Sequence, residues 1–216
     1  YTLNSVVTIT SPVNIFGQNA NLTLSNGLKI NTTDGYRGSV QNVYFKTNAG
    51  TGKGLEVDGY HKAKFDTVNA EGFQNGAEFN YAWSNVLLNC GFHANSTGAV
   101  FQNNCNAFNV ISTSFTNNTN HGASVSSSQK MTFTGCDFSN NTYYGLVIDS
   151  TDNGTLQCLG IKVDSSYCEG NNIDFFVGAG SNAVKVEGCV FTNNTHYGTK
   201  PYGYFVDNAF NTQIIN

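Results

Sequence analysis

The stretch that decides the fold is MTFTGCDFSNN (131–141), with close counterparts in NVLLNCGFHAN (85–95) and VKVEGCVFTNN (184–194). In each of them an aromatic residue stands three positions before an asparagine, and from Phe92 to Phe138 this pair recurs every 23 residues. The aromatic position is occupied in turn by Phe92, Phe115, Phe138, Cys168 and Phe191. A fixed period of this kind indicates a solenoid, in which each repeat stacks on the one before it.

The segments between these positions have the pattern of short strands. Apolar residues alternate with polar ones over a few positions, as at Met131 and Phe133 or at Val184 and Val186. Alternation with period 2 predicts strands, whereas an amphipathic helix needs a period of 3.6. A repeat of about 20–30 residues with two or three strands is one rung of a parallel β-helix. We therefore predict an all-β, right-handed, single-stranded parallel β-helix of about nine rungs, which forms one domain over residues 1–216 and belongs to a longer chain.

The recurring positions also predict what fills the interior and the turns. We expect the aromatic residues to stack inside the rod and the asparagines to form a ladder at a tight turn. One inward position is occupied by Cys90, Thr113, Cys136, Ser166 and Cys189. Cysteines two rungs apart are separated by ~9.6 Å, beyond the ~7 Å that a disulfide spans, so we expect buried free thiols. One bridge, between Cys168 and Cys189 on adjacent rungs, stays open as an alternative.

Composition excludes several classes of partner. Only 11% of the residues are charged, the net charge is −4, and Arg37 is the one arginine, so the clustered cations that bind nucleic-acid phosphates are missing. No apolar run approaches the ~20 residues of a membrane span, and no CxxC pair indicates a zinc site. We expect no metal and no cofactor; calcium is an alternative that the sequence does not indicate. The many Asn, Thr, Ser and Gly residues suit neutral, hydrated partners such as sugars, although turns have the same composition.

The three quoted phrases resemble those of the pectate-lyase-like β-helices, and within that superfamily they look most like bacteriophage tailspikes and polysaccharide depolymerases. The resemblance covers nearly the whole chain, including YTLNSVVTITSPVNIFGQNANLTL (1–24), which is similar to the first rungs of such domains. It implies a homotrimer, on a virion tail or outside the cell, that binds and often cleaves the surface polysaccharide of a bacterial host. The chain departs from the enzymes of plant cell walls, because it has no Asp-Asp pair and only Arg37. Asn120-His121-Gly122 is similar to a His-Gly motif of polygalacturonases, but we interpret His121 as a turn residue.

Placing the rungs in register brings two carboxylates side by side on the outer surface. One outward column consists of Asp66, Leu88, Ile111, Thr134, Asp164 and Glu187. Asp164 and Glu187 then lie on adjacent rungs, with Lys162 and Lys185 two positions earlier. Carboxylates ~5–5.5 Å apart suit a retaining glycosidase, and a separation of ~6.5–9.5 Å suits an inverting one. We therefore predict catalytic roles for both acids and substrate contacts for both lysines; the alternative is a set of ordinary cross-strand ion pairs.

Other outward positions supply further candidates. A second column is formed by Asn80, Gln102, Ser126 and Asp149, with Glu78 two residues before Asn80. The catalytic candidates ranked after the first pair are Asp66, Glu78 and Asp149. The second column either binds sugar hydroxyls or is ordinary solvent-exposed surface. The tyrosines expected in loops, where their rings either stack on sugars or pack the turns, are Tyr143, Tyr144 and Tyr197.

The sequence thus supports one functional hypothesis and two alternatives. We expect a phage tailspike-type protein that binds bacterial capsule, lipopolysaccharide or exopolysaccharide. As an enzyme it would cleave this polysaccharide either by hydrolysis, as a glycoside hydrolase, or by β-elimination, as a polysaccharide lyase. An outward apolar patch is formed by Val86, Leu88 and Ile111. We interpret it as a contact between the subunits of a homotrimer, with burial under a surface loop as the alternative. One alternative is a non-catalytic receptor-binding or shaft module of a tail fibre. The other is a secreted bacterial polysaccharide lyase or adhesin.

Overall fold

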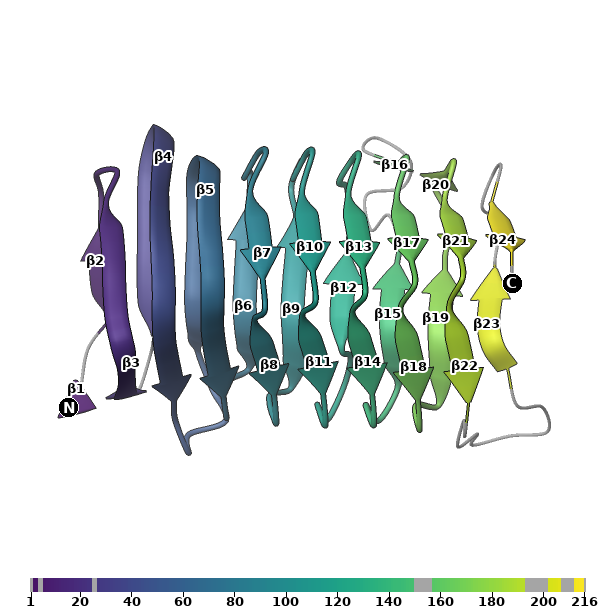
Figure 1. The fold of residues 1–216 in the computed structure, drawn as a ribbon, viewed down its shortest axis with the longest axis horizontal. Coiled ribbons are helices and arrows are strands. Elements are labelled where there is room, and N and C mark those ends of the chain that lie inside the picture. Colours follow the sequence, from purple (N-terminus) through teal and green to yellow (C-terminus); the bar gives the residue numbers. More distant parts are fainter. Residues whose placement is uncertain are drawn as a thin grey trace.

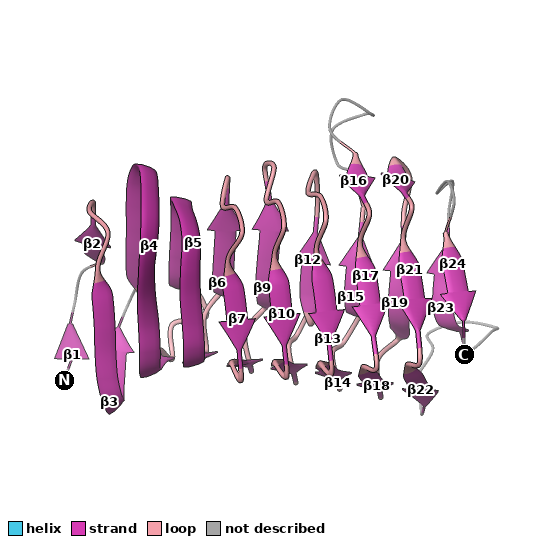
Figure 2. Cartoon of the chain, turned by 45° about the horizontal axis from the view of Figure 1, so that its top comes forward, coloured by secondary structure: helices cyan, strands magenta, loops and turns pink. Residues whose placement is uncertain are grey.

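The chain winds into a rod of stacked coils, with its two ends at opposite ends of the rod (Figure 1). The computed structural model describes residues 2–3, 6–24, 27–149, 157–192, 202–206 and 212–215. Every regular element in these residues is a strand (Figure 2). In the same residues no helix is long and apolar enough to cross a membrane.

Each coil has three faces, and a strand on one face pairs in parallel with the strand above it on the next coil. Face 1 contains β2 (Val7–Ile9), β6 (Asn75–Asn80), β9 (Thr97–Gln102), β12 (Ala123–Val125), β15 (Tyr144–Ile148), β19 (Ile173–Val177) and β23 (Tyr202–Val206). Face 2 contains β7 (Val86–Leu88), β10 (Asn109–Ile111), β13 (Thr132–Thr134), β17 (Lys162–Asp164), β21 (Lys185–Glu187) and β24 (Gln213–Ile215). Face 3 contains β1 (Thr2–Leu3), β8 (Gly91–His93), β11 (Ser114–Thr116), β14 (Asp137–Ser139), β18 (Tyr167–Glu169) and β22 (Val190–Thr192).

The first coils are built from longer strands. β3 (Asn14–Leu24) runs over faces 2 and 3, whereas β4 (Leu28–Lys46) and β5 (Lys53–Glu71) continue over all three faces. A small separate pair, β16 (Cys158–Leu159) and β20 (Ser181–Asn182), lies at the corner between faces 1 and 2. The right-handed β-helix expected from the sequence is therefore the fold of the chain.

The number of rungs differs slightly from the expectation of about nine. The structure has about seven turns. These are the turns from β4 to β22, which have a coil stacked on each side, whereas the coils of β2–β3 and β23–β24 lie at the two ends. The difference arises because the expectation counted the end coils as complete rungs.

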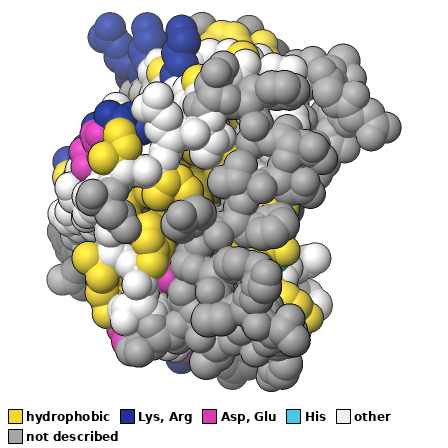
Figure 3. Space-filling view, turned by 90° about the vertical axis from the view of Figure 1, so that its right-hand side faces the viewer, with side chains coloured by type: hydrophobic (Ala, Val, Ile, Leu, Met, Phe, Trp, Pro, Cys, Tyr) yellow, Lys and Arg dark blue, Asp and Glu magenta, His cyan; other side chains and the backbone are white. Residues whose placement is uncertain are grey.

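The interior follows the recurring positions of the sequence. Phe92, Phe115 and Phe138 are fully buried and stack, with ring centroids 5.7 and 5.1 Å apart. Cys168 takes the next place in register, before Phe191. All six cysteines are buried free thiols, so the Cys168–Cys189 bridge is not formed. An end view shows the hydrophobic side chains inside the coil and lysine or arginine side chains at its rim (Figure 3).

The predicted asparagine ladder joins successive coils at the turn after face 3. Asn95 N donates to Asn118 Oδ1 over 3.0 Å, and Asn118 N donates to Asn141 Oδ1 over 3.1 Å. Asn141 N continues the chain of bonds to Asn171 Oδ1 at 2.8 Å. Each side chain therefore satisfies a buried backbone donor of the preceding coil. Asn194 lies outside the described residues.

The corner between faces 2 and 3 needs one residue with a left-handed backbone in each coil. These residues are Gln18, Asn42, Thr67, Asn89, Ser112, Gly135, Ser165 and Gly188, with φ between 47° and 59°. Asparagine and glycine adopt this conformation most readily, whereas a β-branched residue is strained there. Thr67, at φ 54°, is the one β-branched residue among these described corners.

Candidate functional site

The acidic pair predicted from the sequence is present on face 2. Asp164 and Glu187 are partners in the register of β17 and β21. Lys162 Nζ lies 3.2 Å from Asp164 Oδ2 and 2.5 Å from Glu187 Oε1, and Lys185 also contacts Glu187. Hydrogen bonds from Lys162 and Lys185 lower the pKa of Glu187 to about 2. Glu187 is therefore ionised at neutral pH, which suits a nucleophile or base rather than an acid.

Asp66 belongs to the same column but not to the same site. The partners between Asp66 and Asp164 are Leu88, Ile111 and Thr134. Asp66 is held by Lys64, with Nζ and Oδ2 2.8 Å apart, and the hydrogen bond from Lys64 lowers its pKa. Three coils thus lie between Asp66 and Asp164, and four between Asp66 and Glu187.

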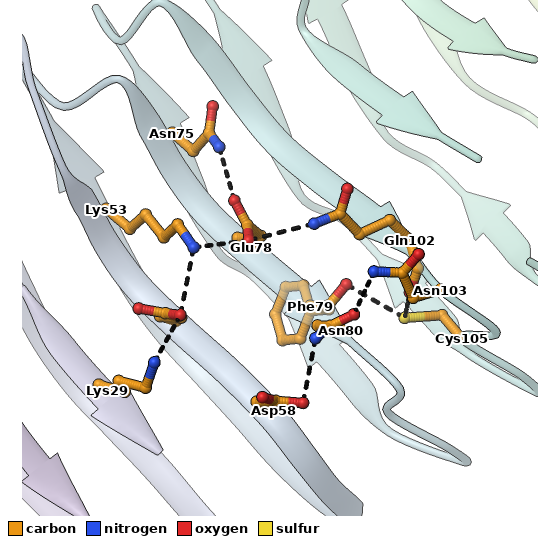
Figure 4. Close-up of polar contacts among 11 residues, drawn as sticks. Lys29, Lys53, Asp58, Asn75, Glu78, Phe79, Asn80, Gln102, Asn103 and Cys105 are labelled. Atoms are coloured by element: carbon orange, nitrogen blue, oxygen red, sulfur yellow. Dashed lines mark hydrogen bonds and ion pairs between the residues drawn. The ribbon is translucent and has the colours of Figure 1, made fainter. Parts of the chain in front are cut away.

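Glu78 lies on face 1 in a network of charges (Figure 4). Lys53 Nζ bridges two carboxylates, at 3.1 Å from Glu56 Oε1 and 2.6 Å from Glu78 Oε1. Glu78 also accepts hydrogen bonds from Asn75 Nδ2 at 2.8 Å and Gln102 Nε2 at 3.2 Å. Burial opposes the charge of Lys53, but the hydrogen bonds to Glu78 and Glu56 outweigh it and raise the pKa of Lys53. Glu78 is thus a nearly buried carboxylate that is fixed from three sides.

The second predicted column follows the edge of face 1. Asn80 and Gln102 are partners in the register of β6 and β9. Ser126 N and Asp149 N continue the same ladder, donating to Phe101 O and Val125 O of the preceding coils. At its start, Asn80 Nδ2 donates to Asp58 Oδ1, and Asn103 Nδ2 donates to Asn80 Oδ1 over 2.7 Å (Figure 4). The predicted register of this column is confirmed, and its polar groups lie side by side on successive coils.

A groove with a volume of about 440 Å³ lies over the same face. It is lined by Val100, Gln102, His121, Ser124, Ser126, Tyr144, Val147, Asp149 and Phe176. His121 stacks on Tyr144 with ring centroids 5.0 Å apart, and Tyr144 stacks on Phe176 at 5.1 Å. Three rings from successive coils therefore form a row beside the polar column of Gln102, Ser126 and Asp149.

His121 is a groove residue and not merely a turn residue as the sequence suggested. Burial lowers its pKa to about 4, so the imidazole is neutral at neutral pH. Among the residues that the structure describes, its buried Nδ1 has no hydrogen-bond partner. The signal for this position was present, because His121 precedes Gly122 as Tyr144 precedes Gly145, and the two glycines are in register. Phe176 was missed because it is in register with the apolar residue Val147 and not with the polar column.

The tyrosines and lysines that the sequence predicts to bind substrate do not come together at one site. Tyr144 lines the groove, and it begins strand β15 instead of lying in a loop. Tyr143 is 51% exposed and meets the His121 ring edge-on at 6.3 Å, outside the groove lining. Tyr197 lies outside the described residues. Lys162 and Lys185 remain with their acidic partners on face 2.

The groove has the chemistry of a site for a neutral, hydroxylated ligand. Among the described residues that line it, Asp149 is the one acid and none is a lysine or arginine. His121 adds no charge at neutral pH because its pKa is lowered. In the part of the chain that the structure describes, no group of three or more His, Cys, Asp or Glu side chains is placed to hold a metal ion.

Comparisons with known proteins agree with this architecture. A family model described as the right handed beta helix region matches residues 26–160 and, in a second alignment, 54–216. None of the curated proteins matches this chain. Among solved structures, ORF18 of Geobacillus virus E2 is similar with a TM-score of 0.51 and 12% identity, over 99% of this chain and 52% of that one. This chain thus spans about half the length of the viral protein.

Two further solved structures have lower TM-scores. The A-module of mannuronan C-5 epimerase AlgE6 from Azotobacter vinelandii has a TM-score of 0.47 and 12% identity, covering 97% of this chain and 80% of that one. Tailspike protein 3 of bacteriophage CBA120 has a TM-score of 0.37 and 12% identity, covering 96% and 51%. The likeness to ORF18 shows the fold alone, whereas the family model covers most of the sequence. The chain therefore belongs to the family of the right handed beta helix region.

Proposed function

We propose that the chain is a phage tailspike-type protein that binds bacterial surface polysaccharide along face 1. The observation that carries this proposal is the row of rings of His121, Tyr144 and Phe176 beside the polar column of the groove. Aromatic rings offer an apolar surface to the faces of sugar rings, while tyrosine keeps a polar hydroxyl. Amide, hydroxyl and carboxylate groups that repeat at the ~4.8 Å spacing of the coils can bind the hydroxyls of successive sugar units.

The charges of the groove favour neutral polysaccharides within this proposal. Among the described residues that line the groove one is acidic, Asp149, and none is a lysine or arginine that would bind the carboxylate of a uronic acid. Like charges brought together in a partly desolvated site repel each other. Capsules, lipopolysaccharides or exopolysaccharides built from neutral sugars are therefore the substrates that this site would prefer.

Cleavage belongs to the same proposal, with Asp164 and Glu187 as the first pair and Asp66, Glu78 and Asp149 behind them. Glu187, ionised and next to Asp164, would act as nucleophile or base, and Asp164 would have to supply the proton. One observation favours the second candidate function, a binding module without catalysis. Lys162 and Lys185 tie both carboxylates into ion pairs, which is the ordinary arrangement of a sheet surface.

Affinity electrophoresis in gels that contain bacterial capsule, O-antigen or exopolysaccharide tests the binding proposal. We expect Tyr144→Ala to weaken polysaccharide binding by about twofold to tenfold, because aromatic contacts contribute about 0.5–1.5 kcal/mol and about 1.4 kcal/mol is tenfold in affinity. Tyr167→Ala is the matched control, since Tyr167 is 39% exposed on face 3. Equal retardation of the two variants, or no retardation of the unaltered protein by any polysaccharide, would contradict the proposal.

Release of new reducing ends or unsaturated sugars decides between the enzyme and the binding module. For an enzyme, Asp164→Asn and Glu187→Gln should each abolish release while retardation in the gel is unchanged. Full release of sugars by both variants would exclude Asp164 and Glu187 as the catalytic pair. The remaining candidates on face 1 would then be Glu78 and Asp149. No release by the unaltered protein from a polysaccharide that it binds would favour the module.

A further inference from the structure

A second hollow lies on face 3, away from the groove of face 1. It has a volume of about 270 Å³ and spans the first coils, where β3, β4, β5 and β8 are stacked. Its lining consists of Asn21, Asn42, Val43, Tyr44, Thr67, Asn69 and His93. Amides, a hydroxyl and two rings therefore converge on one small space that the proposed polysaccharide site does not use.

One carboxylate organises the rings at this hollow. Glu71 Oε2 accepts a hydrogen bond from the Tyr44 hydroxyl and lies 3.5 Å from His93 Nε2. Lys46 Nζ offsets its charge at 2.8 Å from Oε1. The Tyr44 and His93 rings lie in a stacked arrangement with centroids 6.2 Å apart. The two rings are thus held in fixed orientations before any ligand arrives, which is the preorganisation that binding sites need.

Gly91 keeps the hollow open. It is the register partner of Asn69 on the next coil, and Asn69 is the partner of Tyr44. A Cβ atom at Gly91 would overlap Asn69 Oδ1, so the glycine leaves room for the side-chain amide of Asn69. The following coils carry a side chain at this position, beginning with Ser114. The hollow is therefore confined to the first coils.

Thr67 is the second, independent observation at this site. It has a left-handed backbone, with φ 54°, at a corner where none of the other described coils has a β-branched residue. A β-branched residue in this conformation is strained, and strain of this kind collects at functional sites. The Thr67 side chain lines the hollow and donates to Asp66 Oδ1 over 3.1 Å.

We propose that this hollow binds a single neutral sugar unit, at a site separate from the groove of face 1. The Tyr44 and His93 rings offer an apolar surface to the sugar ring, and Asn42, Asn69 and Thr67 supply groups for its hydroxyls. Lys46 balances Glu71, so an acidic sugar finds no spare cation here. The hollow holds one unit because it is confined to the first coils.

Saturation-transfer NMR with methyl glycosides of glucose, galactose, mannose and rhamnose, and with methyl glucuronide, tests this site. We expect signals from at least one neutral glycoside and none from the glucuronide. Thr67→Asn should raise the melting temperature, because the backbone strain is relieved. The same substitution should weaken glycoside binding at least fivefold. Tyr44→Phe should weaken glycoside binding by a similar factor, because Glu71 loses the hydrogen bond from the Tyr44 hydroxyl. Tyr167→Phe is the matched control, since its hydroxyl also binds a glutamate, Glu169, on the same face at 2.6 Å.

Three outcomes would overturn the inference. They are the absence of signal from every methyl glycoside, a preference for the glucuronide, and a stabilised Thr67→Asn protein that binds glycosides unchanged. A failure of the face 1 proposal is distinguishable, because Tyr144→Ala acts on long polysaccharide in the gel and should leave the monosaccharide signals intact.

Discussion

At the scale of single residues, the groove depends on a histidine that stays uncharged. His121 is stacked on Tyr144 and its pKa is lowered to about 4 by burial. A neutral ring can lie against a sugar without attracting anions, whereas a protonated one would need a counter-charge in the groove. Binding to a neutral polysaccharide should therefore be constant between pH 8 and 5 and should change only as His121 takes up its proton.

The same residue predicts a pH dependence of stability. The unfolded chain binds the His121 proton near pH 6.5 and the folded chain only near pH 4. Between these values the unfolded state binds more protons, so the free energy of unfolding falls as the pH decreases from 6.5 to 4. Urea unfolding at pH 7.5, 5.5 and 4.5 should show this fall, and His121→Phe should reduce it. A difference between the two proteins that does not change with pH would contradict the prediction.

The buried thiols give a second prediction for individual residues. Burial raises the pKa of Cys90, Cys105 and Cys136 to about 12. Because the thiolate is the reactive form, the folded protein should not react with Ellman's reagent at pH 8. In guanidinium chloride all six cysteines should react. Fewer than six reacting thiols under these conditions would show a disulfide.

At the scale of the elements, the asparagine ladder predicts which turn residue is costly to replace. Asn118 Oδ1 accepts from Asn95 N, and Asn118 Nδ2 donates to Phe92 O at 3.2 Å. Asn118→Ala leaves both buried groups without these partners, so we expect a loss of about 2–4 kcal/mol in the free energy of unfolding. The control is Asn109→Ala, at an exposed strand position, which should change stability by about 0.5 kcal/mol or less. Equal losses in chemical denaturation would remove the ladder as a stabilising element.

How far the sequence predicts the elements depends on where the recurrence is visible. From Asn85 onward each coil has the aromatic and asparagine positions, and the columns derived from them agree with the register. Before that point β4 and β5 run continuously through all three faces, so no break between strands marks their corners. Tyr44 and Glu71 are partly exposed on these long strands, so their approach to His93 could not be predicted. A strand register does not specify side-chain rotamers. Distances that depend on rotamers, such as those from Lys162 to its acidic partners, could therefore not be predicted either.

At the scale of the whole molecule, the tailspike-type proposal predicts a trimer outside the cell or on a virion. Val86, Leu88 and Ile111 are half-buried outward residues of adjacent coils on face 2. Light scattering after gel filtration should give about three times the chain mass of 23.3 kDa. Leu88→Lys combined with Ile111→Lys should lower the mass to that of one chain if this patch is the contact. A monomer before any substitution would contradict the trimer.

The coils differ in length, and this shows where residues can be added without disturbing the stacked strands. Successive ladder asparagines are 23 residues apart from Asn95 to Asn141 but 30 apart from Asn141 to Asn171. Strands β13 and β17 nevertheless pair in register on either side of the longer coil. The additional residues enter between β15 and β17, directly after the groove residue Asp149. Evolution, or a protein engineer, can therefore lengthen the chain between these two strands while the stacked strands on either side keep their alignment.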